Sequence, residues 1–556
     1  MNRKFILYIT ICMWYLLLAN TTFAYTRQDS LRGGNGSGRS WWDARLYHLS
    51  VSIDTLTRTV AGQNSITARV TNAPGDSIQI DLQEPMMVDS VFFIRNRQES
   101  DTIDPPPYMM LDFKREGNVW WITGPFKKEL VPGNEFTLTV CYHGKPREAK
   151  MPPWDGGFIW TKDSTGKPWI SVACQGLGAS SWWPCKDAQW DEPEYLRLTY
   201  RSNSGLPIIA NGKSPYHSNI YQPKYAKQWA VDNPINTYNV TFYLGDYVYW
   251  KDTLMGENGR LEISFYVLRQ NEEKAKKHFS VVKQMLHCFE HWMGPYPFYE
   301  DGYKLVDAPH LGMEHQSAIA YGNQYKMGYL GMDRSQTGVG LLFDFIIVHE
   351  SGHEWFGNNI TAKDIADNWI HEGFTTYTEV LFAECAFGKE NAFKYNIGKY
   401  SHILNDKPVI GNYGVHDDGS SDIYNKGAAV VHMIRMMIGN DEKFRLMLRE
   451  MNKKYYHQAV TSQEIEEFIM NFTGLELKPF FDQYLRTAKL PTLDWYIKKK
   501  RLHYRFKNAV AGFTLPLEVT DGENKADIRP TNDWQSVPWK KGGYNLEFSK
   551  DFLVQS

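Results

Sequence analysis

Near the middle of the chain, residues 349–353 (HESGH) form an H-E-x-x-H pattern. Residues four apart lie one turn above each other on a helix, so His349 and His353 can offer two imidazole nitrogens to one metal ion. Glu350 then lies beside the metal, where a carboxylate can take a proton from metal-bound water. The pattern predicts a catalytic metal site. Its alternative is a surface helix that happens to carry two histidines and one acid.

A third ligand is expected at Glu372, separated from His353 by eighteen residues, within residues 368–374 (NWIHEGF). The segment between them is short and polar, long enough for a loop and the start of a second, antiparallel helix. Such a hairpin would bring Glu372 to the face that carries the histidines. Two His and one Glu leave the fourth tetrahedral position of zinc open, as in catalytic zinc sites. The sequence therefore predicts one Zn²⁺ per chain.

This spacing, the W-x-x-E-G-F setting of Glu372 and the WFGN run at 355–358 resemble the gluzincin aminopeptidases, the family of aminopeptidase N and the leukotriene-epoxide hydrolase. The resemblance implies a thermolysin-like catalytic domain that uses zinc. It also implies removal of N-terminal residues from peptide substrates with a free amine.

Residues 311–315 (LGMEH) are similar to the G-x-M-E-N element of that family, with Leu311 in place of its glycine and His315 in place of its asparagine. By this likeness Gly312 and Met313 belong to an extended edge strand that binds the peptide backbone. Glu314 would capture the N-terminal ammonium. The alternative is an ordinary surface Met-Glu pair.

The resemblance assigns roles to two further residues. Gln175, which precedes a Pro-Cys-x-Asp element at 184–187, would help to hold the substrate amine. Tyr424, in a Tyr-x-Lys-Gly element at 424–427, would stabilise the oxyanion opposite the zinc. From the residues alone, Gln175 also suits a buried amide that bonds loop backbone, and a tyrosine that opens a helix is commonplace.

Three residues are expected close to these groups. Glu379 lies two turns beyond Glu372 on the second helix, where it either bonds a zinc histidine or is exposed to solvent. His315 and His371 stand where the family has asparagine, each next to a functional glutamate. If they were protonated, each would place a positive charge beside Glu314 or Glu372, and acidification would weaken the enzyme. If they stay neutral, each donates one hydrogen bond as asparagine would.

Residues 1–24 have the pattern of a secretory signal, with a basic start at Arg3 and Lys4, an apolar core at 5–18 and a small-x-small site ending at Ala24. We therefore expect export to a periplasm or the extracellular space. An uncleaved anchor is the alternative, and no other membrane partner is expected. The formal net charge of −2 gives no basic excess for nucleic acid.

The rest of the chain predicts a multidomain α+β protein. Residues 25–44 include a Gly/Ser-rich stretch and are expected to be a flexible linker. Alternation of apolar and polar residues predicts an N-terminal β domain at 45–245 and a small C-terminal β module at 491–556. The zinc metallopeptidase domain is expected at 246–490, where helical patterns dominate and a capping box lies at 461–464.

Five of the six cysteines follow the predicted signal, which is an odd number and no disulfide scaffold for a chain of this length. Cys174 and Cys185 are close enough in sequence to pair in an oxidising compartment. Two buried free thiols are equally compatible with the sequence.

Together these features predict a secreted zinc-dependent aminopeptidase. An endopeptidase or an epoxide hydrolase on the same zinc site is an alternative, because both would use the same metal ligands. An inactive peptide-binding homologue is a second alternative, although every catalytic position is filled.

Overall fold

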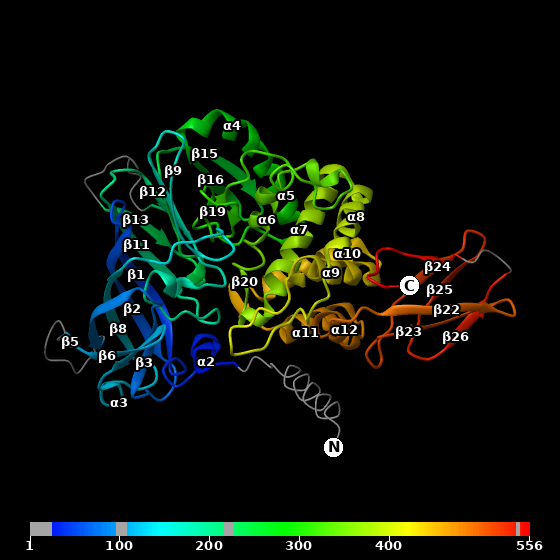
Figure 1. Cartoon of the computed structure of the whole chain (residues 1–556), viewed down its shortest axis with the longest axis horizontal. Coiled ribbons are helices and arrows are strands. Elements are labelled where there is room, and N and C mark those ends of the chain that lie inside the picture. The colour runs from blue at the N-terminus through cyan, green and yellow to red at the C-terminus, as the bar shows by residue number, and fades with distance from the viewer. Residues whose placement is uncertain (1–24, 96–107, 215–225, 541–544, 556) are drawn as a thin grey trace, which may run out of the picture.

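The structure is a computed structural model that describes residues 25–95, 108–214, 226–540 and 545–555. The N-terminal part consists of β-sheets, the middle part of helices around a smaller sheet, and the C-terminal part of strands (Figure 1). This arrangement confirms the α+β class. The boundaries at 245 and 490 stay predictions, and the expected signal at 1–24 lies outside the described residues.

The N-terminal part is built on a large sheet with the strand order β13-β11-β1-β2-β8-β4-β5. The strands of this sheet are β1 (Trp42–Asp54), β2 (Thr59–Val70), β4 (Met87–Arg95), β5 (Met109–Met110), β8 (Glu135–Gly144), β11 (Tyr195–Ser202) and β13 (Lys227–Val231). In β1 the side chains of Leu49, Val51 and Ile53 are buried while Ser52 is exposed, as the alternating sequence predicts.

Two smaller sheets share the hydrophobic core of this part. One has the order β3-β7-β6 and the other the order β12-β14-β10-β9. Their strands are β3 (Ser77–Asp81), β6 (Asp112–Glu116), β7 (Val119–Thr123), β9 (Gly157–Lys162), β10 (Pro168–Ala173), β12 (Ile208–Ala210) and β14 (Phe242–Leu244), and a short helix α3 (Phe126–Glu129) follows β7.

The middle part begins with a mixed sheet of order β15-β16-β17-β19-β18. Its strands are β15 (Tyr247–Gly256), β16 (Gly259–Leu268), β17 (Tyr303–Asp307), β18 (Gly312–Met313) and β19 (Ile319–Tyr321). β18 pairs with β19 and ends the sheet, which is the edge position expected for residues 312–313. The backbone of β18 therefore has one side available for an added strand.

Helices form the rest of the middle part. They are α4 (Glu272–His278), α5 (Val282–Met293), α6 (Phe345–Gly352), α7 (Trp369–Phe387), α8 (Lys389–Gly398), α9 (Asn425–Ile438), α10 (Asp441–Lys454), α11 (Ser462–Thr473) and α12 (Lys478–Arg486). The Asp344 side chain caps α6 by accepting from the backbone N–H groups of Ile346 and Ile347. The capping box expected at Thr461 and Glu464 starts α11. A short parallel pair, β20 (Ile360–Ala362) and β21 (Gln458–Val460), joins the loop after α6 to the segment before α11.

The C-terminal strands form two small sheets, β22-β23-β26 and β25-β24-β27. They are β22 (Thr492–Lys498), β23 (Arg501–Lys507), β24 (Leu517–Thr520), β25 (Lys525–Ile528), β26 (Gln535–Pro538) and β27 (Glu547–Phe548). Their buried side chains belong to the same core cluster as α9 and α12. The hydroxyl of Tyr484 in α12 donates to the Leu553 carbonyl over 2.9 Å, so this module is packed onto the helices.

The prediction of a flexible linker at 25–44 is wrong. Residues Arg27–Gly33 form helix α2, which starts with a capping box at Thr26 and Asp29. The side chain of Arg39 is buried and forms an ion pair with Asp81, and its guanidinium also donates to backbone carbonyls of the α2 end. Gly/Ser-rich composition lowers local order, but this buried charge pair and the buried Trp41 anchor the segment to the sheet.

The structure pairs two cysteines that the sequence did not single out. Cys288 in α5 and Cys385 in α7 form a disulfide, at a sequence separation of 97. Cys174 and Cys185 are free and buried, the second of the two expected states, and burial raises the pKa of both thiols. Spacing along the chain could not predict the pair, because only the packing of α5 against α7 brings it together.

Candidate active site

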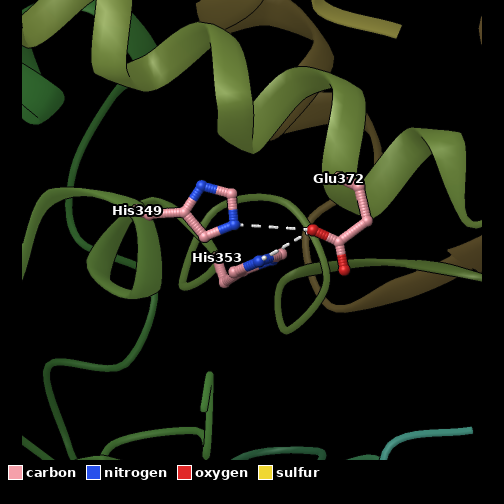
Figure 2. A group of neighbouring side chains, drawn as sticks. All are labelled: His349, His353 and Glu372. Carbon is pink, nitrogen blue, oxygen red and sulfur yellow. Dashed lines mark ion pairs between the residues drawn. The ribbon is translucent and has the colours of Figure 1, made fainter. Parts of the chain in front are cut away.

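The expected zinc ligands meet between α6 and α7. His349 lies in α6, His353 directly follows its last residue, and Glu372 lies in the first turn of α7. Glu372 Oε2 is 3.5 Å from His349 Nε2 and 3.3 Å from His353 Nε2 (Figure 2). The helical hairpin predicted from the sequence thus places all three side chains around one point, and all three are buried.

The other nitrogen of each imidazole has an acceptor, which determines the tautomer. His353 Nδ1 donates to the Phe356 carbonyl over 2.9 Å, and His349 Nδ1 lies 2.8 Å from Glu379 Oε1. A carbonyl cannot donate, so Nδ1 of His353 carries a hydrogen, and in the neutral ring Nε2 keeps a lone pair that points toward Glu372. The Glu379 carboxylate orients His349 in the same way.

Glu379 is buried, so the alternative prediction that it is exposed to solvent is wrong. Besides His349, its carboxylate accepts from the Tyr395 hydroxyl over 2.6 Å and from Lys399 Nζ over 2.9 Å. Burial opposes ionisation, but the Lys399 ammonium and the His349 ring lower the pKa of Glu379 to about 2. An ionised Glu379 therefore stays available to orient His349 across the physiological pH range.

The geometry of these groups fits a zinc ion. The ligand atoms of His349, His353 and Glu372 lie within 4.8 Å of one another. Among the described residues, the buried Oε2 of Glu372 has no hydrogen-bond donor. Lone pairs that face one another in a buried site are unfavourable unless a cation lies between them, and this donor set is the one that catalytic zinc prefers.

Glu350 lies beside this point and not within the ligand set. Its carboxylate is within 4.8 Å of ligand atoms of Glu314 and His353. Burial raises the pKa of Glu350 to about 7, although the neighbouring His349 acts in the opposite direction. A Cβ at Gly312 of β18 would lie 2.5 Å from Glu350 Oε1, so glycine at 312 leaves room for this carboxylate.

Tyr424 reaches the site because α7 and α9 approach closely. A Cβ at Gly427 would lie 2.8 Å from the Cα of Gly373, so two glycines face each other where the helices cross. This contact places Tyr424, just before α9, with its ring 6.1 Å from that of His349. Burial and the carboxylate of Glu372 hold the pKa of Tyr424 well above its usual value, so the hydroxyl is a neutral donor.

On the opposite side of the site, Glu314 accepts hydrogen bonds from two side chains of the N-terminal part. Gln175 Nε2 donates to Glu314 Oε1 over 2.5 Å and also lies 3.2 Å from Glu372 Oε1. The Tyr238 hydroxyl donates to the same Oε1 of Glu314 over 3.1 Å. Both donors use one carboxylate oxygen, which leaves the second oxygen of Glu314 for a ligand. Burial raises the pKa of Glu314.

The backbone around Glu314 is also held. Asn358, the last residue of the WFGN run, donates its amide to the Glu314 carbonyl over 2.9 Å. Met313 is buried beside the N-terminal core, and Gly312 precedes it in the edge strand. Glu314, Met313, Gly312 and Leu311 line a cavity of about 740 Å³, whose walls also include the zinc ligands, Glu350 and Tyr424.

The two unusual histidines are neutral, which corrects the hypothesis that acid would charge them. Burial lowers the pKa of His315 well below its usual value and that of His371 to about 3. His315 Nδ1 lies 2.6 Å from the Tyr243 hydroxyl, which itself donates to the Ala318 carbonyl. His371 Nε2 accepts from the Ala362 N–H over 2.7 Å. His315 therefore donates one hydrogen bond, as the neutral alternative expects, whereas His371 accepts one.

Sequence reasoning missed several residues of this site. Tyr238 carried no signal, because it lies in a three-residue 3-10 helix between β13 and β14, far from any motif. Tyr395 and Lys399 follow α7 by fewer than fifteen residues, and a buried lysine near a candidate zinc site could have been sought as a partner for Glu379. Tertiary packing alone brings these side chains to the site.

Comparison with known proteins places this geometry in a family. Residues 278–484, which contain the zinc ligands, Glu350, Glu314 and Tyr424, match the model for the peptidase family M1 domain. This match covers most of the middle part of the chain and supports a zinc metallopeptidase. This confirms the gluzincin resemblance and the enzyme class expected from the sequence, and members of the M1 family bind zinc at such sites.

Similar proteins extend the likeness beyond the M1 domain. The chain is 22% identical to leukotriene A-4 hydrolase of Xenopus laevis over 450 residues, which is 76% of this chain and 67% of that protein. It is 25% identical to aminopeptidase B of Mus musculus over 420 residues, 70% of this chain and 59% of that protein. The chain thus spans only part of the length of these relatives, so their activities do not transfer to it directly.

Solved structures show the same fold. An M1 zinc metallopeptidase of Deinococcus radiodurans bound to a Tyr-Ser-Ala substrate superposes with a TM-score of 0.63 at 19% identity, covering 82% of this chain and 96% of that one. Yeast leukotriene A4 hydrolase superposes with a TM-score of 0.64 at 16% identity, covering 81% and 69%. The N-terminal sheets and the M1 domain therefore form a known two-part architecture.

Proposed function

We propose that this protein is an aminopeptidase that hydrolyses the first peptide bond of peptides with a free N-terminus. The observation that carries the proposal is the position of Glu314. Its carboxylate lies within 4.8 Å of ligand atoms of Glu350 and His353, and the donors of Gln175 and Tyr238 occupy only one of its oxygens. An ammonium bound to the other oxygen would lie about one residue from the reacting carbonyl.

Binding of the amine sets the position of the substrate. The ammonium pairs with Glu314, and the peptide backbone lies along the free edge of β18. In a buried site an ammonium is favourable only when a carboxylate compensates it, so a peptide with a blocked N-terminus loses this interaction. Glu314 thereby makes the enzyme select for chain ends.

Glu350 is the proposed general base. Its carboxylate takes a proton from the attacking water and delivers it to the nitrogen of the departing peptide. Burial, which raises its pKa to about 7, suits a group that must both accept and release a proton near neutral pH. Gly312 keeps open the space in which this carboxylate moves.

The remaining charge develops on the oxygen of the attacked carbonyl. Tyr424 is neutral and donates its hydroxyl hydrogen toward this oxygen. His349, His353 and Glu372 would hold the zinc ion, which when bound supplies a positive charge that polarises the carbonyl and acidifies water. Glu379 keeps His349 in the tautomer that this task requires.

We also propose that the protein is exported. The signal-like pattern at 1–24 supports this, and a disulfide between Cys288 and Cys385 is typical of an oxidising compartment. In the described part of the chain, no helix has the length and apolarity needed to span a bilayer. Export is tested by locating the protein in fractionated cells and sequencing its mature N-terminus, which we expect to be Tyr25.

An epoxide hydrolase or an endopeptidase on the same groups is the second candidate, and the similarity to leukotriene A-4 hydrolases favours the epoxide hydrolase of the two. One panel separates the three activities. It contains aminoacyl amides, the same compounds N-acetylated, an internally quenched longer peptide and a fatty-acid epoxide, each with and without a chelator. We expect chelator-sensitive cleavage of free-amine compounds. Equal cleavage of the acetylated compounds would contradict the aminopeptidase proposal.

A further inference from the structure

Helix α2 lies where the N-terminal sheets meet the M1 domain, next to the loop that precedes α9 (Figure 1). The turn at Gln175 and Gly176 forms part of the wall of the active-site cavity. Behind this turn is a second, small cavity of about 50 Å³, whose walls include Gln175, Gly176, Arg32, Gly33 and His416. Helix α2 thus stands directly behind the wall that carries Gln175.

Two side chains donate hydrogen bonds to the same backbone carbonyl of this turn. The carbonyl of Gly176 accepts from His416 Nε2 over 2.6 Å and from Arg32 Nη2 over 3.3 Å. The other guanidinium nitrogen of Arg32, Nη1, pairs with Asp187 Oδ2 over 3.4 Å. Asp187 is in turn bound by the backbone N–H and hydroxyl of Ser180. The guanidinium therefore connects the Gln175 turn to a fixed point in the N-terminal part.

The end of α2 also fits closely against the loop of the M1 domain. A Cβ added at Gly33 would lie 2.4 Å from the backbone nitrogen of His416 and 2.7 Å from that of Val415. Further along, the same loop lines the active-site cavity through Asp418 and Gly419. Helix α2 is therefore packed simultaneously against the loop that holds His416 and against the turn that carries Gln175.

We propose that α2 is a positioning element of the substrate site, with Arg32 and His416 as positioning residues for Gln175. They hold the Gln175 turn so that its amide reaches Glu314 over 2.5 Å, and they close the cavity behind the substrate amine. Hydrogen bonds of this length are lost when the donor moves by about 1 Å, so a small shift of the turn uncouples Gln175 from Glu314. The inference rests on the aminopeptidase function proposed above.

The test uses full-length protein with substitutions at two neighbouring residues at the end of α2. Arg32→Ala removes the donor, and Gly33→Val pushes α2 away from the M1 loop. Gly36→Ala is the matched control, because a Cβ at Gly36 meets nothing within 4 Å. We expect the KM for free aminoacyl amides to rise about tenfold in the first two variants, with kcat changed less than twofold and the control unchanged. Arg32→Lys should restore part of the loss, since one ammonium cannot serve Gly176 and Asp187 together.

A purely structural role would give a different result: less folded protein, lower apparent kcat and the same KM. Preference for free over N-acetylated substrate provides a second readout, which we expect to fall about tenfold in Arg32→Ala and Gly33→Val. The two variants act on the same contact from different residues, so one that folds, as judged by thermal unfolding, is sufficient. Unchanged KM and preference in a folded variant would overturn the proposal.

Hydrogen–deuterium exchange tests the positioning without any activity. In the turn, the N–H of Leu177 donates to the Gln175 carbonyl over 2.8 Å and that of Gly178 to the Cys174 carbonyl over 2.6 Å. We expect these amides to exchange faster in Arg32→Ala and Gly33→Val but not in Gly36→Ala. If the parent protein cleaves no aminoacyl amide, the proposed function fails, whereas this exchange still reports on the turn. Faster exchange with unchanged KM would overturn the positioning role.

Discussion

The zinc side and the amine side of the site are built in different ways. On the zinc side, His349, His353 and Glu372 come from one helical hairpin within 24 residues of sequence. On the amine side, Glu314 stands at the edge of one sheet, and its partners Gln175 and Tyr238 come from the N-terminal part of the chain. The first half needs only local structure, whereas the second exists only when two parts of the molecule are docked.

This difference predicts which property each half controls. Changes on the zinc side should alter metal binding or kcat, because they affect groups that act on the reacting bond. Changes on the amine side should alter KM and the demand for a free N-terminus, because they affect where the substrate lies. The predictions below test this division, beginning with the largest effect.

Glu350→Gln should lower kcat by about 10²- to 10⁴-fold while one zinc per chain is retained, because an amide cannot carry the proton. The measurement is steady-state kinetics together with metal analysis of the purified variant. Loss of zinc would show that Glu350 is a ligand and would contradict its assignment as the base.

Glu314→Ala should reduce the preference for free over N-acetylated substrates by about 10²-fold. A buried ammonium without its partner costs roughly 2–5 kcal/mol, and this penalty falls on free-amine substrates alone. Both substrate classes should be assayed on the same preparation, with zinc content as the control. A variant that cleaves free-amine substrates as well as the parent would remove Glu314 from the amine site.

Glu379→Gln should weaken zinc binding by about 10- to 100-fold, since an amide orients the Nδ1–H of His349 less strongly than a carboxylate. Competition with a chromophoric chelator measures the affinity. With zinc in excess, KM for free-amine substrates should equal that of the parent. A raised KM under saturating zinc would show that the two halves of the site are not separable in this way.

Tyr238→Phe should raise KM about tenfold with little change in kcat, because it removes one hydrogen bond to a buried carboxylate, worth about 1.5 kcal/mol. The matched change on the zinc side is Tyr395→Phe, which removes one hydrogen bond to the buried Glu379. That variant should instead weaken zinc binding. If Tyr238→Phe instead weakened zinc binding and Tyr395→Phe raised KM, the proposed division between the two sides of the site would be wrong.

His315→Asn should leave the acid limb of kcat/KM between about pH 5 and 8 unchanged. The pKa of His315 lies well below its usual value because the ring is buried, so it gains no proton in this range. Asparagine would supply the same neutral donor to Tyr243. An acid limb that moves in this variant would show that His315 does titrate.

Much of the zinc side followed from the sequence. Side chains four apart on a helix share a face, and the eighteen-residue gap suits a helical hairpin, so His349, His353 and Glu372 could be placed without coordinates. The alternating strands and the capping box at Thr461 are local patterns of the same kind. The edge position of Gly312 was expected by resemblance. Gln175, Glu314 and Tyr424 were expected by resemblance, and the structure brings all three to one cavity.

Other features depend on contacts between distant segments, which no local pattern encodes. Tyr238 meets Glu314 across 76 residues, and Cys288 meets Cys385 across 97. Residues 25–44 looked flexible by composition, yet the ion pair of Arg39 with Asp81 orders them.

The sequence by itself thus placed His349 and His353 on one helix face, because residue spacing on a helix is a property of the backbone alone, and the length of the segment before Glu372 suits a helical hairpin. Only the tertiary structure showed how Glu314 meets its partners on the amine side, that His315 and His371 are neutral, and where α2 packs. Burial and charge compensation at those positions depend on which surfaces pack together. Those surfaces come from segments far apart in sequence, so local sequence patterns do not predict the free energy of their contacts.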